Sequence, residues 1–486
     1  MSKATKKLRE DNRIDNWSYL WMAMFTAVGF LIFNIINSFF GTTVLKFFGA
    51  TIIVLLIGGL LYSAWKKTNS ERRTVYIILF ISIVLRICYV IYTSGGEFSG
   101  EDFNIFTQVQ TNLTLPEAPQ PLYYIVSAAI YNFMAMFHFT APFSMDIVRL
   151  VTEYMGIVSA IAIYYILCEL EANDTAIYLG TSIIAFHPGL IRLGGEISPL
   201  MPMFAMITLA IVFLTRWNNF TNGFDFIMMS VFFGVAVMID MSALILLPVI
   251  AVLVVINLVR VITRKNLANI VSTLLQTLAG LAVFGIMSFA YPVKNIAMGQ
   301  PVGIMELFGS SQGDLNLKTK FLSFSAKELF DVFIHSNDKC AWVYLVKSSV
   351  FGKAQQLDPV LPDAALRVFI GIAFASAAIS GFCVFGNMIA RADSKKKVNI
   401  WTIIAMVGCT VAYYILQNRG SQSASAMDFR VIPVILALGV TMLCNGMKVL
   451  SMKKKLSFVS QILYLLTVIV CLTFCIGCVI YGCWFI

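Results

Sequence analysis

The sequence predicts an all-α polytopic membrane protein with about 13 transmembrane helices and two large extracytoplasmic loops. Of its 486 residues, 59% are hydrophobic and only 12% are charged, which is about half the charged share of a soluble domain. Apolar runs of about 20 residues, the length that crosses a bilayer, recur from Trp17 to the end of the chain. These observations exclude the soluble, fibrous and disordered classes of protein.

The predicted spans follow the apolar runs. They cover residues 17–38, 44–65, 74–93, 147–168, 175–192, 199–216, 225–241, 243–262, 268–291, 365–390, 398–416, 429–448 and 461–485. The first run follows a basic tail and is too long for the core of a cleaved signal peptide, so we expect a retained anchor with a cytoplasmic N-terminus. The net charge is +10, and the excess of lysine and arginine lies in short basic loops beside the spans. This distribution is typical of signals that orient a membrane protein rather than of nucleic-acid binding.

One apolar segment, 121–137, is not expected to cross the membrane, because it is short and opens with Pro121. If it crossed, the basic clusters within 66–73 and 391–397 would fall on opposite faces of the membrane. If it does not cross, every basic cluster is cytoplasmic. The positive-inside rule therefore predicts a re-entrant or juxtamembrane segment, and it places the C-terminus outside the plasma membrane.

Four regions follow from this topology. They are an N-terminal tail and transmembrane hairpin (1–73), a membrane core (74–291) with the first outer loop (94–146), a second large outer loop (292–364) and the C-terminal transmembrane helices (365–486). Because both large loops are on the outer face, we expect the chemistry of the protein to take place there.

The first outer loop is acidic and contains no lysine or arginine. Its acids are Glu97, Glu101, Asp102, Glu117 and Asp146. Glu101 and Asp102 follow a glycine-rich stretch just outside a span, where a carboxylate can act as a general base toward a hydroxyl acceptor. An ordinary solvated acidic loop is the alternative, but the lack of basic neighbours favours a functional role.

Further candidates lie where this loop ends. Glu117 and Gln120 precede Pro121, and Tyr123 and Tyr124 follow it. The two tyrosines are expected at headgroup depth, either as contacts to a lipid-linked substrate or as part of an ordinary aromatic belt.

Two more candidate groups lie at the outer ends of spans. Arg149 either binds a phosphate or pairs with Glu153, one helical turn away. His187 and Glu196 belong to a glycine-containing turn between two spans, with Arg192 close to the acid.

Six short motifs occur in order between about residues 74 and 448. They are Gln120–Tyr124, His187–Pro188, Tyr291–Asn295, Gly299–Pro301, Val346–Gly352 and Met427–Pro433. Together they resemble integral-membrane glycosyltransferases of the GT-C superfamily. The resemblance is closest to the protein-mannosyltransferase-like and aminoarabinose-transferase-like members found in Gram-positive bacteria.

The resemblance implies a GT-C-type fold whose first outer loop carries a catalytic acid and is followed by membrane-surface helices. It assigns the general base to Asp102, with Glu101 as its neighbour. It also implies that Arg149 and the motif Asp428–Arg430 meet the donor.

The sequence departs from the family pattern at three places. In the first outer loop, relatives often have His-Asp where this chain has Glu101 and Asp102. Relatives have Gln-Pro-Pro-Leu-Tyr where this chain has Gln120–Tyr123, one proline short. Relatives also have Asn-Asn-Asp near the second outer turn, where this chain has Ser198–Leu200. An acid that could bind a metal or the acceptor is therefore missing at that turn, unless Glu196 substitutes for it.

The sequence thus predicts a glycosyltransferase. It would move a mannose-like or other hexose or pentose from a polyprenyl-phosphate donor to a glycan, lipid or protein acceptor of the cell envelope, with inversion. The residues expected to stabilise the donor phosphate are Arg149, Arg430 and Lys347. The residues expected to contact substrate are Glu117, Gln120, Tyr123, Tyr124, His187 and Glu196. No histidine or cysteine cluster has metal-ligand spacing, so no cofactor is predicted, and a divalent cation is the alternative.

Two other readings of the sequence stay open. A transporter or flippase for a lipid-linked sugar would need polar residues along a path through the membrane, for which Arg86 and Asp240 are the candidates. A nonenzymatic scaffold would explain the degenerate second acidic motif.

Overall fold

The computed structural model describes twelve stretches of the chain. They are residues 70–95, 101–112, 120–263, 267–297, 299, 320–321, 324–331, 340–352, 363–389, 394–418, 428–452 and 458–485. The chain divides into two compact units, Met1–Lys67 and Thr68–Ile486, and all the described residues belong to the second. The predicted spans 17–38 and 44–65 lie outside the described residues.

Every regular element in the described stretches is a helix, which confirms the all-α class. Among them, nine helices are long and apolar enough to cross a membrane, so the chain is a multi-pass membrane protein. They are α4 (Ser70–Tyr92), α7 (Ala141–Glu169), α10 (Leu200–Phe220), the 3-10 helix η1 (Met241–Leu246) continued by α12 (Leu247–Thr263), α13 (Leu267–Ala297), α16 (Asp363–Ile389), α17 (Ser394–Gln417), α18 (Val434–Met452) and α19 (Phe458–Phe485).

The predicted span 175–192 is broken into two helices. They are α8 (Asp174–Phe186) and α9 (Pro188–Gly195), which meet at an angle of 42°. The break occurs at Pro188, whose ring cannot continue a helix and which lacks an N–H donor. The pair forms either one bent span or a re-entrant loop.

Three other apolar helices in the described stretches are shorter than the nine, and one of them is Ala341–Phe351. The predicted span 225–241 corresponds to α11 (Gly223–Ile239), which has 17 residues. The segment expected not to cross contains α6 (Leu122–Met136), which has 15 residues. At about 1.5 Å per residue, α6 reaches about 22 Å, which is less than the roughly 30 Å of a hydrocarbon core. Its length therefore suits a re-entrant or juxtamembrane position.

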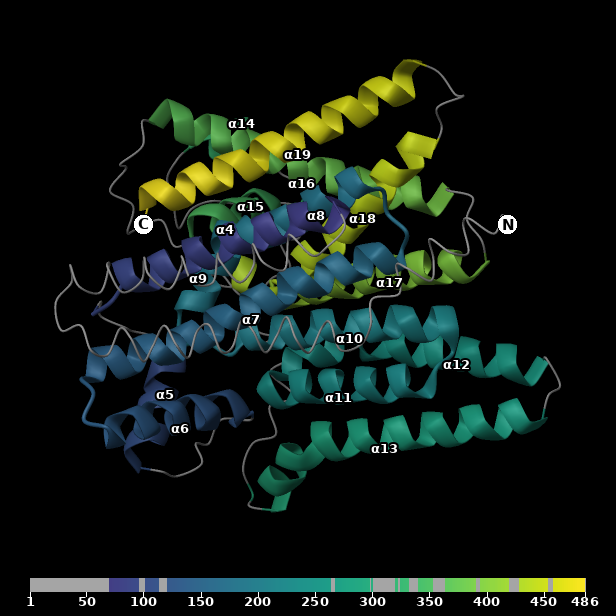
Figure 1. Cartoon of the computed structure of the whole chain (residues 1–486), viewed down its shortest axis with the longest axis horizontal. Coiled ribbons are helices and arrows are strands. Elements are labelled where there is room, and N and C mark those ends of the chain that lie inside the picture. The colour runs from purple at the N-terminus through teal and green to yellow at the C-terminus, as the bar shows by residue number, and fades with distance from the viewer. Residues whose placement is uncertain are drawn as a thin grey trace. The chain divides into compact units, whose positions relative to one another are not determined.

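Close packing of α10, α11 and α13 forms one side of the bundle (Figure 1). Glycines allow the helices to approach each other. A Cβ added at Gly280 of α13 would lie 2.4 Å from the ring of Phe226, and one added at Gly234 of α11 would lie 2.9 Å from Met287. Small residues at such contacts are typical of helix pairs in membranes, where van der Waals packing replaces the hydrophobic effect.

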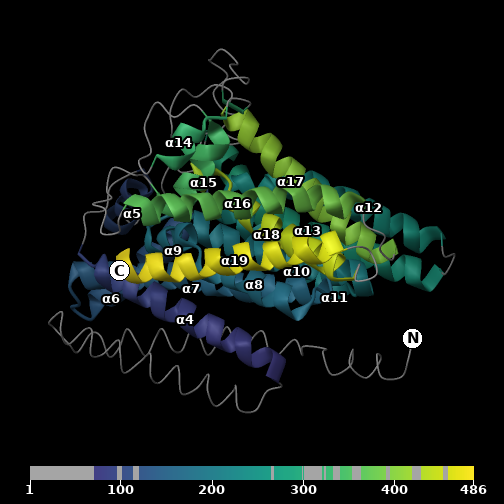
Figure 2. The ribbon, with the colours of Figure 1, turned by 90° about the horizontal axis from the view of Figure 1, so that it is seen from above.

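The short helices gather toward one end of the bundle, which we call the outer end. They are α5 (Glu101–Asn112), α6, α9, α14 (Ala326–Phe330) and α15 (Ala341–Phe351). Both views place them toward the end at which the C-terminus of α19 lies (Figures 1 and 2). The two large predicted outer loops, 94–146 and 292–364, contribute four of these five helices.

Polar contacts tie the helix ends together at the opposite end of the bundle. Arg260 Nη1 donates to Asn218 Oδ1 at 3.1 Å, and Asn218 Nδ2 donates to Asn399 Oδ1 at 2.6 Å. Lys448 Nζ donates to the carbonyl oxygen of Leu170 at 2.8 Å. Arg260 and Lys448 belong to basic clusters that the positive-inside rule places in the cytoplasm.

We predict that Thr107 of α5 is accessible from outside the cell and Thr263 of α12 from inside. Both threonines are exposed, and each hydroxyl bonds only to its own helix, so replacement by cysteine should perturb little. In a cysteine-free background, an impermeant thiol reagent should label Thr107→Cys in intact cells and Thr263→Cys only after permeabilisation. Labelling of both variants in intact cells would contradict this orientation.

Candidate active site

Asp102 lies in the first turn of α5, at the outer end of the bundle. The α5 helix packs against α6, and this contact brings Tyr124 to the carboxylate. Tyr124 Oη donates to Asp102 Oδ1 at 2.5 Å. Asp102 is partly exposed, whereas Tyr124 is only 4% exposed. One carboxylate oxygen is thus held by the protein while the side chain stays within reach of a ligand. Glu101 is the first residue of α5, and its side chain is outside the described part of the structure.

A second tyrosine supports the first. The rings of Tyr123 and Tyr124 meet edge to face, with centroids 5.4 Å apart. Tyr123 Oη lies 3.4 Å from Thr152 Oγ1 of α7. Burial raises the pKa of Tyr123 to about 12, and burial together with the nearby Asp102 carboxylate raises the pKa of Tyr124 further. Both hydroxyls therefore keep their protons at neutral pH and act as donors.

Gln120 immediately precedes this helix and is buried, with 6% of its surface exposed. Neither its amide oxygen nor its amide nitrogen has a hydrogen-bond partner among the described residues. The predicted substrate-contact residue Glu117 lies outside the described residues.

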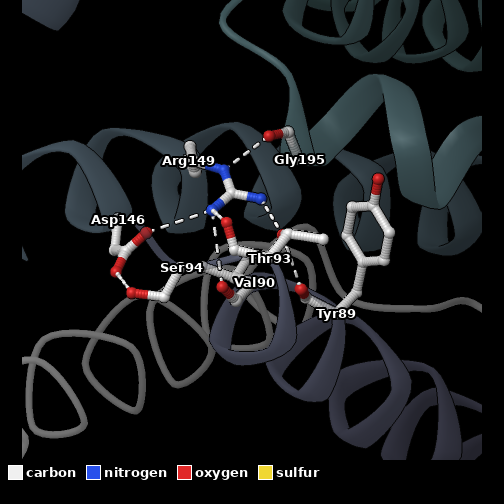
Figure 3. A network of polar contacts seen from close by, with 7 residues as sticks. All are labelled: Tyr89, Val90, Thr93, Ser94, Asp146, Arg149 and Gly195. Atoms are coloured by element: carbon white, nitrogen blue, oxygen red, sulfur yellow. Dashed lines mark hydrogen bonds and ion pairs between the residues drawn. The ribbon is translucent and has the colours of Figure 1, made fainter. Parts of the chain in front are cut away.

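Arg149 of α7 joins three segments of the outer end (Figure 3). Its Nε donates to the carbonyl oxygen of Gly195 at 2.6 Å, and its Nη1 donates to Asp146 Oδ1 at 3.0 Å and to the carbonyl oxygen of Thr93 at 3.3 Å. Its Nη2 donates to the hydroxyl of Thr93. Ser94 donates to the other carboxylate oxygen of Asp146 and so closes the network.

The Arg149 guanidinium is enclosed by these partners and is 1% exposed. Arg149 is bonded to the turn at Gly195. This position leaves no room for a residue larger than glycine, because a Cβ there would lie 2.3 Å from the ring of Tyr89. The geometry therefore gives Arg149 a role in positioning the end of α4 and the turn after α9.

Glu153 lies one helical turn from Arg149, whose charge acts on it, but its ion pair is with another arginine. It pairs with Arg86 of α4, and both side chains are fully buried. A Cβ at Gly156 would lie 2.2 Å from Arg86, and one at Gly194 would lie 2.3 Å from Glu153. The ion pair is therefore embedded between closely packed helices.

Arg430 makes a second, more open cluster. Its Nη2 lies 2.6 Å from Glu196 Oε1, and the two side chains are 37% and 32% exposed. The backbone N–H of Arg430 donates to Asp428 Oδ1 at 3.1 Å, which forms the start of the short 3-10 helix η6 (Phe429–Val431). Of the three predicted phosphate-binding residues, Arg430 is thus the one whose side chain reaches the surface.

His187 and Lys347 are both buried, on segments that pack against η6. The His187 ring packs against Phe429, with ring centroids 5.6 Å apart, and its Nδ1 has no partner among the described residues. The Lys347 side chain is fully buried. Ser348 links the segments, because its hydroxyl accepts the Phe429 N–H at 3.0 Å and its carbonyl accepts Arg192 Nη2 at 3.1 Å. Three motifs that are far apart in the sequence therefore meet in space.

Asp240 is a neighbour of the site that the sequence suggested only for a transport path. It follows α11 and caps η1, where its Oδ1 accepts the Ser242 N–H at 2.7 Å. Its charge interacts with Asp102 and with Tyr124. The signal in the sequence is an acid between two apolar runs, but the sequence does not show which outer segment it faces.

In the part of the chain that the structure describes, no group of three or more histidine, cysteine, aspartate or glutamate side chains could hold a metal ion.

No family model matches the sequence, and no curated protein matches it. Among solved structures, the chain is similar to the crystal structure of the Archaeoglobus fulgidus oligosaccharyltransferase in the apo form, with 13% sequence identity and a TM-score of 0.45. The match covers 86% of this chain and 56% of that one, so this chain spans little more than half the length of the archaeal protein.

We predict that Arg149→Ala lowers the free energy of unfolding by about 3–5 kcal/mol, because it removes the buried cation that pairs with Asp146 and donates to several carbonyl groups. The thermal unfolding midpoint of the purified protein in detergent checks this. Arg367→Ala is the matched control, since Arg367 is exposed on α16, and it should leave the midpoint unchanged. Equal midpoints for the two variants would contradict the positioning role of Arg149.

Proposed function

We propose that this protein is a membrane glycosyltransferase that moves a sugar from a polyprenyl-phosphate donor to a hydroxyl-bearing acceptor of the cell envelope, at the outer face of the plasma membrane. The observation that carries the proposal is the Asp102 carboxylate, which is partly exposed, held by a buried tyrosine, and located at one end of a bundle of membrane-spanning helices. The order of the sequence motifs adds support.

In the proposed reaction Asp102 is the general base. Tyr124 engages Oδ1, so Oδ2 can take the proton of the acceptor hydroxyl. The hydroxyl oxygen then attacks the anomeric carbon, a new glycosidic bond forms, and the bond from that carbon to the phosphate oxygen breaks. The configuration at the anomeric carbon inverts, and polyprenyl phosphate leaves with the electron pair of the broken bond. General-base help of this kind typically contributes about 10²–10⁴-fold in rate.

Arg430 is proposed to meet the donor phosphate. A guanidinium has five N–H donors in a planar fork, so Arg430 can keep its bond to Glu196 and still bind a phosphate. Lys347 would add positive charge from below the surface, and Arg149 would hold the turn that carries Glu196. A lipid-phosphate leaving group already carries its own charge, so stabilisation by fixed cationic side chains suffices for the proposed step.

The substrate-contact role of Glu117, Gln120 and His187 stays a prediction. Gln120 fits it best among the three, because its buried amide has hydrogen-bonding capacity that the described residues do not use.

A transporter or flippase is less well supported. Of its two candidate polar residues, Arg86 is fully buried and ion-paired with Glu153 between packed helices. The other, Asp240, caps a helix and lies near Asp102 rather than alone in the bilayer.

We predict that Asp102→Asn abolishes nearly all sugar transfer, a loss of about 10²–10⁴-fold, because the amide keeps the shape of the carboxylate and cannot take the proton. Glu101→Gln should have a milder effect. The measurement is transfer of radiolabelled sugar by both purified variants in the same lipid, with donor binding followed in parallel. Near-native transfer by Asp102→Asn would contradict the mechanism, and loss in Glu101→Gln alone would move the base by one residue.

We predict that Arg430→Lys weakens donor binding about tenfold or more, because lysine keeps the charge but loses the planar fork, and a hydrogen bond to a charged group is worth roughly 1.5–3 kcal/mol. Equilibrium binding of a labelled polyprenyl-phosphate sugar checks this, with Arg367→Lys as the control. Unchanged affinity in Arg430→Lys would make Arg430 a membrane-edge anchor only.

A further inference from the structure

Tyr124 has a geometry that a simple lipid-contact residue would not need. Its ring is buried, and its hydroxyl points at the Asp102 carboxylate, 2.5 Å away. The ring is fixed from the other side by Tyr123, which is in turn attached to Thr152 of α7. A chain of contacts thus runs from a long, buried helix to the carboxylate on α5.

We propose that Tyr124 is a positioning residue that orients the Asp102 carboxylate and keeps it in the ionised, proton-accepting form. This inference rests on the proposed function, and it replaces the substrate-contact role expected for Tyr124 from the sequence.

The physical reason is that a hydrogen bond donated to a carboxylate favours its charged form. Tyr124 can donate throughout the neutral range, because burial and the adjacent carboxylate raise the pKa of its own hydroxyl. The bond also fixes which oxygen of Asp102 is left for the acceptor, since Oδ1 is engaged.

The need for such a donor follows from the other groups around Asp102. The described titratable groups that act with it are Tyr124 and Tyr123 on α6 and Asp240 at the end of α11. In its ionised form Asp240 is a like charge, which opposes ionisation of a carboxylate, whereas a donated hydrogen bond favours it.

The neighbouring tyrosine offers a matched control. Tyr123 is equally buried and lies in the same turn of α6, but its hydroxyl is next to Thr152 and not Asp102. Tyr123→Phe and Tyr124→Phe each delete one buried hydroxyl and keep the ring, so any difference between them reports the contact with the carboxylate.

The first readout is the pH dependence of sugar transfer by the purified full-length protein. A general base must be ionised, so activity falls as the pH drops and the carboxylate becomes protonated. Without its donor the carboxylate is protonated at a higher pH. In Tyr124→Phe the acidic limb of the profile should therefore move to higher pH by about one unit. The kcat at neutral pH should fall about tenfold, with the KM for the donor within about twofold of wild type.

Two further variants test the direction in which the acidic limb of the pH profile moves. Tyr123→Phe should leave the position of the acidic limb unchanged. Asp240→Asn removes the like charge and should move the limb to lower pH, opposite to Tyr124→Phe. A limb that does not move in Tyr124→Phe, or that moves equally in Tyr123→Phe, overturns the inference, as does a rise in KM with kcat unchanged.

A second readout does not depend on transfer. The infrared band of the Asp102 carboxylate can be identified because it is missing in Asp102→Asn. As the pH is lowered, this band should be lost through protonation at a higher pH in Tyr124→Phe than in wild type. If this shift is present while wild-type protein shows no sugar transfer, the proposed function fails and the role of the Tyr124 contact stands. If transfer is present and neither readout shifts, the inference fails and the proposed function stands.

Discussion

The buried guanidinium of Arg149 is the interaction on which the outer end of the structure depends. It binds the last turn of α4, its own helix α7 and the turn after α9 at the same time. A buried arginine must have all its donors satisfied, because an unpaired charge in a low-dielectric interior is strongly destabilising. The backbone around it is therefore restricted to one arrangement. That arrangement fixes the turn that carries Glu196, and Glu196 in turn contacts Arg430.

The proposed site has an acidic and a basic part at the same end of the bundle. The acidic part is Asp102, supported by the buried tyrosines of α6. The basic part is Arg430, which contacts Glu196, and the buried Lys347 is next in sequence to Ser348, whose hydroxyl accepts the N–H of Phe429. A lipid-linked sugar presents an anion at headgroup depth and a reactive carbon beside it, so an enzyme for such a donor needs both kinds of group near the membrane surface. In this protein the proposed base, Asp102, lies on a short outer helix, and the proposed cation, Arg430, lies near the end of a long span. This arrangement suits that requirement.

Sequence reasoning predicted the helical class and the positions of most described spans, because apolar runs of bilayer length report directly on burial in lipid. The composition of the first outer loop drew attention to the Glu101–Asp102 pair, and the family resemblance assigned the base to Asp102, which stays a prediction. Sequence reasoning failed where the partner of a residue is decided by tertiary packing. The spacing of Arg149 and Glu153 left a pair between them as one alternative, but it gave no sign of Arg86, which forms an ion pair with Glu153 because α4 packs against α7. The contact between Tyr124 and Asp102 joins two short helices. No local sequence pattern shows how these helices are placed relative to each other. The break between α8 and α9 had a visible signal in Pro188, but hydropathy alone joined the two helices into one span.

Sugar transfer by this protein can be tested by following the sugar itself. Purified protein is reconstituted in sealed vesicles with a radiolabelled polyprenyl-phosphate sugar and cell-envelope acceptors outside. For a glycosyltransferase, we expect the label to leave the lipid and become covalently attached to the acceptor, with release of polyprenyl phosphate. If the label stays on its lipid and only changes leaflet, the protein is a flippase and not a glycosyltransferase.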